Sequence, residues 1–217
     1  MINKNTTPSP TPQNRRGGVE SGPILKKAII CHGVAQNKEY FMSEPLPSCA
    51  KNWIPWLQKK FLIHGMDCQT PAFPNSWIPA RDYNDDVKVF ERFDINENTT
   101  LVGHSCGTGF LLKYLSTNPH IKIRHLVLVA PSINMPDIQN YEIVKYLDKN
   151  LPDRIWRIDL FISDNEPIQR IRESAEQLIK MYPSINVHRF QNHGHFTEGE
   201  MGTKEFPELW EVCKSEI

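Results

Sequence analysis

The sequence Thr100-Leu101-Val102-Gly103-His104-Ser105-Cys106-Gly107 passes from an apolar segment into a short turn flanked by glycines. A largely apolar run, Phe110 to Leu115, follows at once, so a strand is expected to turn directly into a helix here. Such a turn strains the backbone of its central residue, and side chains in place of Gly103 and Gly107 would collide with the adjoining strand and helix. The pattern therefore predicts that the Ser105 hydroxyl is held clear of the edge of a sheet.

Apolar segments and amphipathic segments alternate on both sides of this turn. Strands are expected near 24–31, 67–70, 99–102, 124–130, 157–162 and 186–190, and helices near 49–63, 82–93, 107–117, 168–181 and 206–212. Continuous apolar strands separated by helices predict an α/β fold of three layers, in which helices cover both faces of a mostly parallel central sheet. The segment 132–151 has a weaker pattern and is expected to form a minimal cap over the site.

Length and charge bound the class of protein. A chain of 217 residues favours one domain, which we expect at 23–217, and the polar residues 1–22 are expected to form a disordered N-terminal tail. Lys plus Arg and Asp plus Glu number 25 each, so the formal net charge is zero. A neutral chain has no global field to attract nucleic acid or an anionic membrane, so neither is an expected partner.

The cysteines indicate the compartment. Five of them, at positions 31, 49, 68, 106 and 213, show no C-x-x-C pair, which favours free thiols over a disulfide framework. The chain has no stretch long enough for a membrane helix, and its first residues lack the apolar core of a signal peptide. We therefore expect a cytoplasmic protein. As a separate expectation, it is a monomer or a weak dimer.

Several residues with chemical potential follow the expected strands. They are His32-Gly33, Ser105, Pro131, Asp164 with Glu166, and His195. Ligands of parallel α/β sheets bind beyond the carboxyl ends of the strands, so these loops are expected to converge on one edge.

Ser105 needs a base, because a serine hydroxyl is a weak nucleophile at neutral pH. His195 is the candidate base, His193 is a weaker one, and either histidine alternatively only hydrogen-bonds its own loop. A carboxylate is then required to orient the imidazole, and both Asp164 and Glu166 are available. Whichever of the two is not used is expected to be a loop charge or a helix cap.

Backbone N–H groups near the turn are candidates for an oxyanion hole. One is that of Cys106 at the start of the helix, and the other is that of Gly33 or Val34. Cys106 is also a rival nucleophile, although it lies one position past the tip of the turn. His104 is expected to pack beside the sheet. A zinc site needs three or more ligands at matched spacing, and the cysteines are scattered, so we expect neither a metal nor a cofactor.

Taken together, these motifs resemble the family of small serine hydrolases of α/β-hydrolase fold that includes retinoblastoma-binding protein 9. The resemblance covers about residues 24–215. It rests on Trp53-x-x-Trp56-Leu57, Pro71 and Pro74, the turn at 103–107, Ser163-Asp164-Asn165-Glu166-Pro167 and Gly194-His195-Phe196. The order serine, acid, histidine along the chain is that of α/β-hydrolases. The resemblance implies that Ser105 is the nucleophile and His195 the base. The reaction it implies is the cleavage of a small acyl substrate, an ester, thioester or amide, through an acyl-enzyme.

One position departs from the family pattern. The family usually has its catalytic aspartate immediately before the proline of the acidic motif, and Glu166 stands there in this chain. The extra methylene of glutamate shifts the carboxylate, so Asp164 remains a competitor for the role. The departure also keeps open a second hypothesis, a catalytically weak protein that uses the hydrolase scaffold for binding or regulation.

Overall fold

The computed structural model describes residues 25–215, and the predicted tail at 1–22 lies outside them. Six strands form one sheet in the order β2-β1-β3-β4-β5-β6, with every neighbouring pair parallel. The strands are β1 (Lys27–Cys31), β2 (Asp67–Gln69), β3 (Thr99–His104), β4 (Ile123–Val129), β5 (Ile155–Ser163) and β6 (Asn186–Phe190). The predicted parallel sheet is thereby confirmed.

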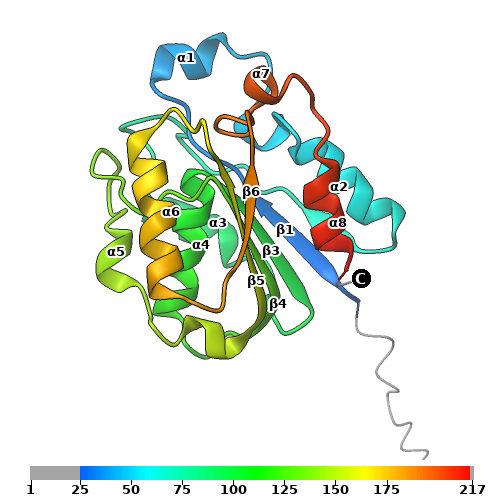
Figure 1. Ribbon diagram of the computed structural model, residues 1–217. Coiled ribbons are helices and arrows are strands. Elements are labelled where there is room, and N and C mark those ends of the chain that lie inside the picture. Colours follow the sequence, from blue (N-terminus) through cyan, green and yellow to red (C-terminus); the bar gives the residue numbers. More distant parts are fainter. Residues whose placement is uncertain (1–24, 216–217) are drawn as a thin grey trace, which may run out of the picture.

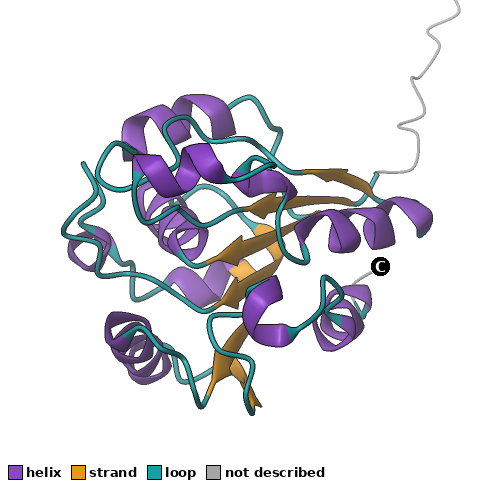
Figure 2. Cartoon of the chain, turned by 90° about the horizontal axis from the view of Figure 1, so that it is seen from above, coloured by secondary structure: helices purple, strands orange, loops and turns teal. Residues whose placement is uncertain are grey.

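Helices cover both faces of the sheet, as the alternating pattern predicted. Figure 1 shows α2 and α8 on one face, α3, α4 and α6 on the other, and α1 and α7 above one end of the strands, and Figure 2 shows helices on both sides of the sheet from above. The helices are α1 (Lys38–Ser43), α2 (Ile54–Ile63), α3 (Tyr83–Phe90), α4 (Cys106–Thr117), α5 (Ile143–Tyr146), α6 (Gln169–Met181), α7 (Glu198–Met201) and α8 (Pro207–Lys214), with 3-10 turns at Ser48–Ala50 and Leu151–Arg154.

The central strands are buried on both faces because successive side chains enter different cores. In β1, Ile29 and Cys31 join the core formed with α3 and α4, whereas Ala28 and Ile30 join the core formed with α2 and α8. A strand of this kind is apolar at every position, which is why hydropathy alone locates it in the sequence.

Two short helices have no counterpart among the sequence predictions. No residue of α1 or α7 is buried, so no apolar period marks either helix. The α7 turn is held by Glu200, whose Oε2 accepts the Thr197 hydroxyl at 2.8 Å and the His195 N–H at 2.7 Å. The helix expected over 49–63 is also shorter than predicted and begins at Ile54, with a proline in its first turn.

The segment 132–151 lies beside α4 rather than over the sheet edge. Ile133, Ile138, Tyr141 and Ile143 are buried in the core on that face, and α5 packs on α4. The expectation that this segment covers the site is wrong, because its apolar residues are used to complete the core.

A buried carboxylate joins three neighbouring strands. Asp159 on β5 accepts hydrogen bonds from His125 on β4 at 2.7 Å and from His188 on β6 at 2.6 Å. Arg157 Nε donates to the same carboxylate at 2.5 Å. Burial alone would raise the pKa of Asp159, but these hydrogen bonds outweigh it and hold the pKa well below its usual range.

We expect Asp159→Asn to lower the free energy of unfolding by about 3 kcal/mol at pH 7, because it removes one partner of a buried charged cluster. Since the pKa of Asp159 is depressed in the folded state, its stabilisation is present above the unfolded pKa of about 4 and is lost as the pH falls further. Urea unfolding between pH 7 and pH 2 measures the difference, which should shrink toward pH 2. Asp94→Asn removes an exposed ion pair with Lys27 and serves as the control. A difference that stays constant across this range contradicts the prediction.

Candidate active site

Ser105 occupies a strained turn between β3 and α4. Its backbone angles are φ 52° and ψ −122°, a region that residues with a side chain rarely adopt. The Ser105 N–H donates to the Val129 carbonyl on β4 at 2.9 Å, which ties the turn to the sheet. The residue is 9% exposed and lines a pocket, so the predicted strained turn is confirmed.

The two glycines of this turn have no room for a side chain. A Cβ atom on Gly107 would lie 2.2 Å from the Cys31 carbonyl oxygen, and one on Gly103 would lie 2.8 Å from backbone atoms of Thr108. Both distances are far below contact, and both neighbours are backbone atoms that side-chain rotation cannot move. Side chains at these two positions would therefore collide with the backbone, as expected from the sequence. The close approach at Gly107 also shows that α4 begins directly against the end of β1.

We expect Gly107→Ala to lower the free energy of unfolding by about 3 kcal/mol, since α4 would have to move away from β1 to admit the methyl group. Gly199→Ala is the control, because a Cβ atom there meets nothing within 4 Å. Urea unfolding of both variants at pH 7 makes the comparison. Equal free energies of unfolding for the two variants would contradict the prediction, because α4 could then move away from β1 without any loss of stability.

His195 is paired with Glu166. The distance between His195 Nδ1 and Glu166 Oε2 is 2.8 Å, and the Glu166 side chain is 4% exposed. The second oxygen, Oε1, accepts the Ile168 N–H at 3.0 Å, so the longer glutamate side chain folds back on its own loop. The backbone of that loop is fixed in turn by Arg172, which donates to the Glu166 carbonyl.

Asp164, the other carboxylate that the sequence offered, has a different contact. Its Oδ1 accepts the Asn192 N–H at 3.0 Å, and the residue is exposed. It joins the loop after β5 to the loop after β6, two residues away from the carboxylate that contacts His195. The structure therefore brings Glu166 to the histidine and leaves Asp164 as a loop contact.

The loop that carries His195 is held by hydrogen bonds from distant segments. They run from His104 Nε2 to the His195 carbonyl at 2.8 Å, from Trp53 Nε1 to the Phe196 carbonyl at 3.1 Å, and from the Gly194 N–H to Asn165 Oδ1 at 2.8 Å. Burial, together with the neighbouring His195, lowers the pKa of His104 to about 3, so its ring is neutral. The sequence indicated only that His104 packs beside the sheet, and its contact with this loop was not predicted.

The remaining candidates are the oxyanion-hole residues, the rival nucleophile and the second histidine. Gly33 and Val34 line the same pocket as Ser105, and Cys106 is the first residue of α4, where N–H groups lack an intrahelical acceptor. Burial raises the pKa of the Cys106 thiol, which keeps it protonated and disfavours it as a nucleophile. His193 does not line the pocket, and its Nδ1 contacts the Gln191 carbonyl at 2.8 Å.

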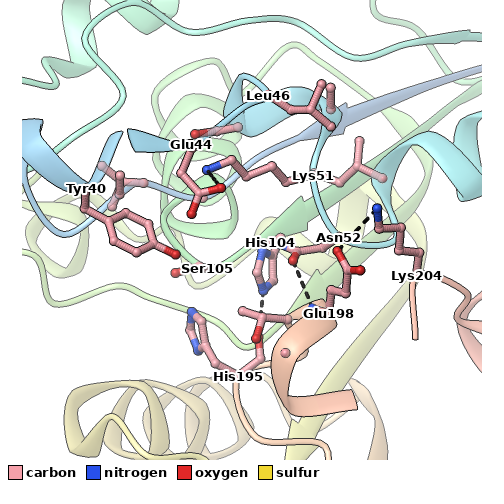
Figure 3. A pocket seen from close by; sticks show the side chains of 18 of the residues that line it. Tyr40, Glu44, Leu46, Lys51, Asn52, His104, Ser105, His195, Glu198 and Lys204 are labelled. Carbon is pink, nitrogen blue, oxygen red and sulfur yellow. Dashed lines mark hydrogen bonds and ion pairs between the residues drawn. The ribbon is translucent and has the colours of Figure 1, made fainter. Parts of the chain in front are cut away.

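The pocket has a volume of about 740 Å³, within the range of small-molecule sites. Its labelled lining residues are shown in Figure 3: Tyr40, Glu44, Leu46, Lys51, Asn52, His104, Ser105, His195, Glu198 and Lys204. Two ion pairs lie on its walls, one between Lys51 and Glu44 at 2.9 Å and one between Lys204 and Glu198 at 3.6 Å. Tyr40 lies in α1 and Glu198 in α7, so the two unpredicted helices and the segments that follow them contribute to the walls.

Ser105 and the His195 ring face the same space on the floor of this pocket (Figure 3). No hydrogen bond joins the two side chains among residues 25–215. Such bonds are often long without substrate and shorten when the substrate binds. Pro131, which also follows a strand, does not line the pocket; the next residue, Ser132, packs on α4 through a 2.9 Å bond from its N–H to Thr108 Oγ1.

The strand order and the serine turn agree with a comparison to known families. The family model described as the alpha/beta hydrolase fold matches residues 29–160, more than half of the chain. The chain belongs to the α/β-hydrolase family. The matched region of this α/β hydrolase includes the Ser105 turn and ends within β5, before Glu166 and His195.

The α/β hydrolase is similar over most of its length to a bacterial protein. It is 26% identical over 211 residues to the "Putative hydrolase YdeN" of Bacillus subtilis, covering 88% of this chain and 96% of that protein. The crystal structure of the ydeN gene product has a TM-score of 0.69 at 21% identity, covering 88% and 98% of the two chains. The family match and the similarity to this putative hydrolase support hydrolase activity, whereas the solved structure shows the shared fold. The narrower resemblance to the family of retinoblastoma-binding protein 9 stays a prediction.

Two further solved structures share the fold. One is described as an alpha-beta serine hydrolase homologue from Coxiella burnetii, with a TM-score of 0.56, 16% identity and coverage of 90% of this chain and 88% of that one. The other is the esterase domain of a Rhodothermus marinus protein, with a TM-score of 0.58, 13% identity and coverage of 91% and 88%. At these identities the likeness establishes the α/β-hydrolase architecture.

The structure also bears on the cysteines, on membrane-spanning helices and on metal-binding groups. The five cysteines are free thiols, as predicted. Across residues 25–215 no helix is both long and apolar enough to cross a membrane. The same part of the chain has no group of three or more His, Cys, Asp or Glu side chains arranged to hold a metal ion.

Proposed function

We propose that this protein is a serine hydrolase that cleaves a small ester, thioester or amide through an acyl-enzyme on Ser105. The observation that carries the proposal is the 2.8 Å contact of Glu166 with His195, which lines the same pocket as Ser105. Glu166 occupies one ring nitrogen, Nδ1, so Nε2 is left to face the serine. A buried carboxylate, an imidazole and a strained serine then form one acid–base chain.

In this mechanism the Ser105 oxygen attacks the carbonyl carbon of the substrate while His195 Nε2 takes the hydroxyl proton. The Glu166 carboxylate stabilises the resulting imidazolium through the Nδ1–H bond. His195 then gives the proton to the leaving group, and the bond between the acyl carbon and the leaving group breaks. A water molecule, activated by the same histidine, hydrolyses the acyl-enzyme and restores the serine.

The negative oxygen of the tetrahedral intermediate needs hydrogen-bond donors. We assign this role to the backbone N–H of Cys106 and to that of Gly33 or Val34, because these residues adjoin Ser105 on two sides. The amino end of α4 adds its favourable dipole at the same place. Removing one donor of this kind commonly lowers kcat by about 10²- to 10³-fold.

The pocket supports a small substrate with polar character. Lys51 and Lys204 are each paired with a glutamate, so the walls offer both signs of charge in balance. Leu46 supplies an exposed apolar surface beside them. The alternative of a weak binding or regulatory protein rested on the glutamate at position 166, and the contact of that glutamate with His195 leads us to disfavour it.

The proposal is tested with the full-length protein and a fluorophosphonate probe, followed by mass spectrometry of the labelled peptide. We expect one label per chain on the peptide that contains Ser105, and hydrolysis of p-nitrophenyl esters. A panel of esters from acetyl to dodecanoyl then maps the acyl preference. Folded protein that takes no label and cleaves no ester would refute the proposal in favour of the binding hypothesis.

A further inference from the structure

Behind the loop that follows β1 lies a completely buried arginine. Arg81 Nη1 donates to the Gly33 carbonyl at 2.8 Å and to the His32 carbonyl at 3.3 Å, and Nε donates to Asp86 Oδ2 at 2.7 Å. The guanidinium lies 4.8 Å from the centre of the Phe73 ring and 5.7 Å from that of Tyr141. The group is therefore fixed in both position and orientation.

The direction of these hydrogen bonds sets the direction of two N–H groups. In a planar trans peptide the C=O of one residue and the N–H of the next point to opposite sides. The carbonyls of His32 and Gly33 point at Arg81, so the N–H groups of Gly33 and Val34 point away from it. Gly33 and Val34 line the pocket beside Ser105, whereas Arg81 does not, so we take the side of the loop opposite Arg81 as the side that faces the pocket.

His32 supports the same arrangement. Its Nε2 accepts the Phe73 N–H at 3.1 Å, and its Nδ1 donates to the Gly33 carbonyl at 2.6 Å. Burial, together with the charge of Arg81, lowers the pKa of His32 to about 3, so this ring is a neutral brace. The Gly33 carbonyl thus has two donors on the buried side of the loop.

The buried ion pair of Arg81 and Asp86 is not expected to add much to the stability of the fold. Arg81 Nη2 and Asp86 Oδ1 are buried and have no hydrogen-bond partner among the described residues. Ion pairs of this kind are commonly replaced by apolar residues without loss of stability. The function of the pair is better sought in the geometry that it imposes on the loop.

We propose that Arg81 is a positioning residue that holds the peptides after His32 and Gly33 so that their N–H groups serve as the second side of the oxyanion hole. The catalytic consequence rests on the proposed serine-hydrolase function. Arg81 does not touch the substrate, and it acts through the two peptides and through its fixed positive charge behind them.

The Asp86 carboxylate also accepts the Tyr141 hydroxyl. The test therefore uses the full-length double variant Arg81→Met/Asp86→Asn, which removes both buried charges and keeps an acceptor oxygen for Tyr141. The control is Arg154→Met. Arg154 is also largely buried and donates to two carbonyls, those of Leu115 and Ile121, and to Asp148, at the opposite end of the sheet. Readouts are kcat and KM for p-nitrophenyl acetate, the inhibition constant of a phenylboronic acid, and a crystal structure of each protein.

We expect kcat of the double variant to fall by about 100-fold with KM within about threefold, because one oxyanion donor is misplaced. The boronate, whose adduct with Ser105 carries a negative oxygen, should lose affinity by a similar factor. Arg154→Met should change neither quantity by more than about threefold. A loss of kcat in the double variant no larger than in Arg154→Met, or an unchanged boronate affinity, overturns the proposal.

Two further measurements keep the outcomes separate. If the double variant does not fold, Arg81→Lys, which keeps the charge but reaches one carbonyl only, is held to the same criteria with an expected loss of about 10-fold. If wild-type protein neither cleaves esters nor binds the boronate, the proposed function fails, and the crystal structures alone decide the inference. Rotation of the two peptides in the variant then supports positioning by Arg81, and unmoved peptides refute it.

Discussion

Replacing Ser105 with alanine is expected to lower kcat/KM for p-nitrophenyl acetate by about 10⁵-fold and to abolish labelling by a fluorophosphonate. The variant loses the atom that forms the covalent bond, while the oxyanion donors and the pocket remain, so a small residual rate above that in water should persist. Alanine still carries a Cβ atom at φ 52°, so the strain of the turn and the free energy of unfolding should change little.

Ser116→Ala is the matched control for this experiment. Ser116 lies in the last turns of the same helix, α4, and its hydroxyl oxygen accepts the Asp148 N–H at 3.1 Å. We expect full labelling and unchanged kcat/KM in this variant. A Ser105→Ala protein that retains more than about one per cent of the wild-type kcat/KM would place the nucleophile elsewhere.

The second large effect is expected at the carboxylate. Glu166→Gln should lower kcat by about 10⁴-fold, because an amide NH₂ facing His195 Nδ1 forces the ring into the tautomer that cannot accept the serine proton. The variant keeps the size of the side chain and the contact with the Ile168 N–H. The KM should therefore stay within a few-fold of the wild-type value, which steady-state kinetics with a p-nitrophenyl ester would establish.

Asp164→Asn provides the comparison, since this carboxylate contacts the Asn192 N–H rather than the histidine. An asparagine oxygen can accept the same bond, so we expect kcat within about threefold of wild type. The reverse pattern, a large loss in Asp164→Asn and a small one in Glu166→Gln, would transfer the orienting role to Asp164 and contradict the assignment.

The parts of the molecule that the sequence predicts are those with a local cause. A strand buried on both faces is apolar throughout, and the turn at Ser105 needs its two glycines because backbone lies within contact distance of each. These patterns are contained in a few consecutive residues. The sheet and the position of the serine could therefore be derived before any coordinates.

The choice between Asp164 and Glu166 could not be derived in this way. The two residues are separated by one position, and the decision depends on a contact between Glu166 and His195, which are 29 residues apart in the sequence. The roles of Trp53, His104 and Arg81 depend on contacts over still longer separations. Nothing in the local sequence around these residues marks which distant carbonyl each of them will meet.

The segments that form the pocket walls could not be predicted from the sequence either. The segment 132–151 was expected over the site because its pattern was weak, yet its scattered apolar residues complete the core beside α4. The walls come largely from 40–52 and 195–204 instead, and the short helices α1 and α7 in these segments bury no residue and therefore leave no periodic signal. Weak periodicity alone does not distinguish a covering segment from an irregular part of the core.

The absence of buried residues in α1 has a consequence for how this enzyme scaffold can change. Because α1 contributes Tyr40 to the pocket without burying any residue, we expect changes there to alter the proposed acyl preference more than the stability. Mutations at Tyr40 or Leu46 can therefore be sampled freely in directed evolution, with little need for compensating changes elsewhere. Libraries confined to Tyr40 and Leu46 should yield new acyl preferences at a nearly constant melting temperature.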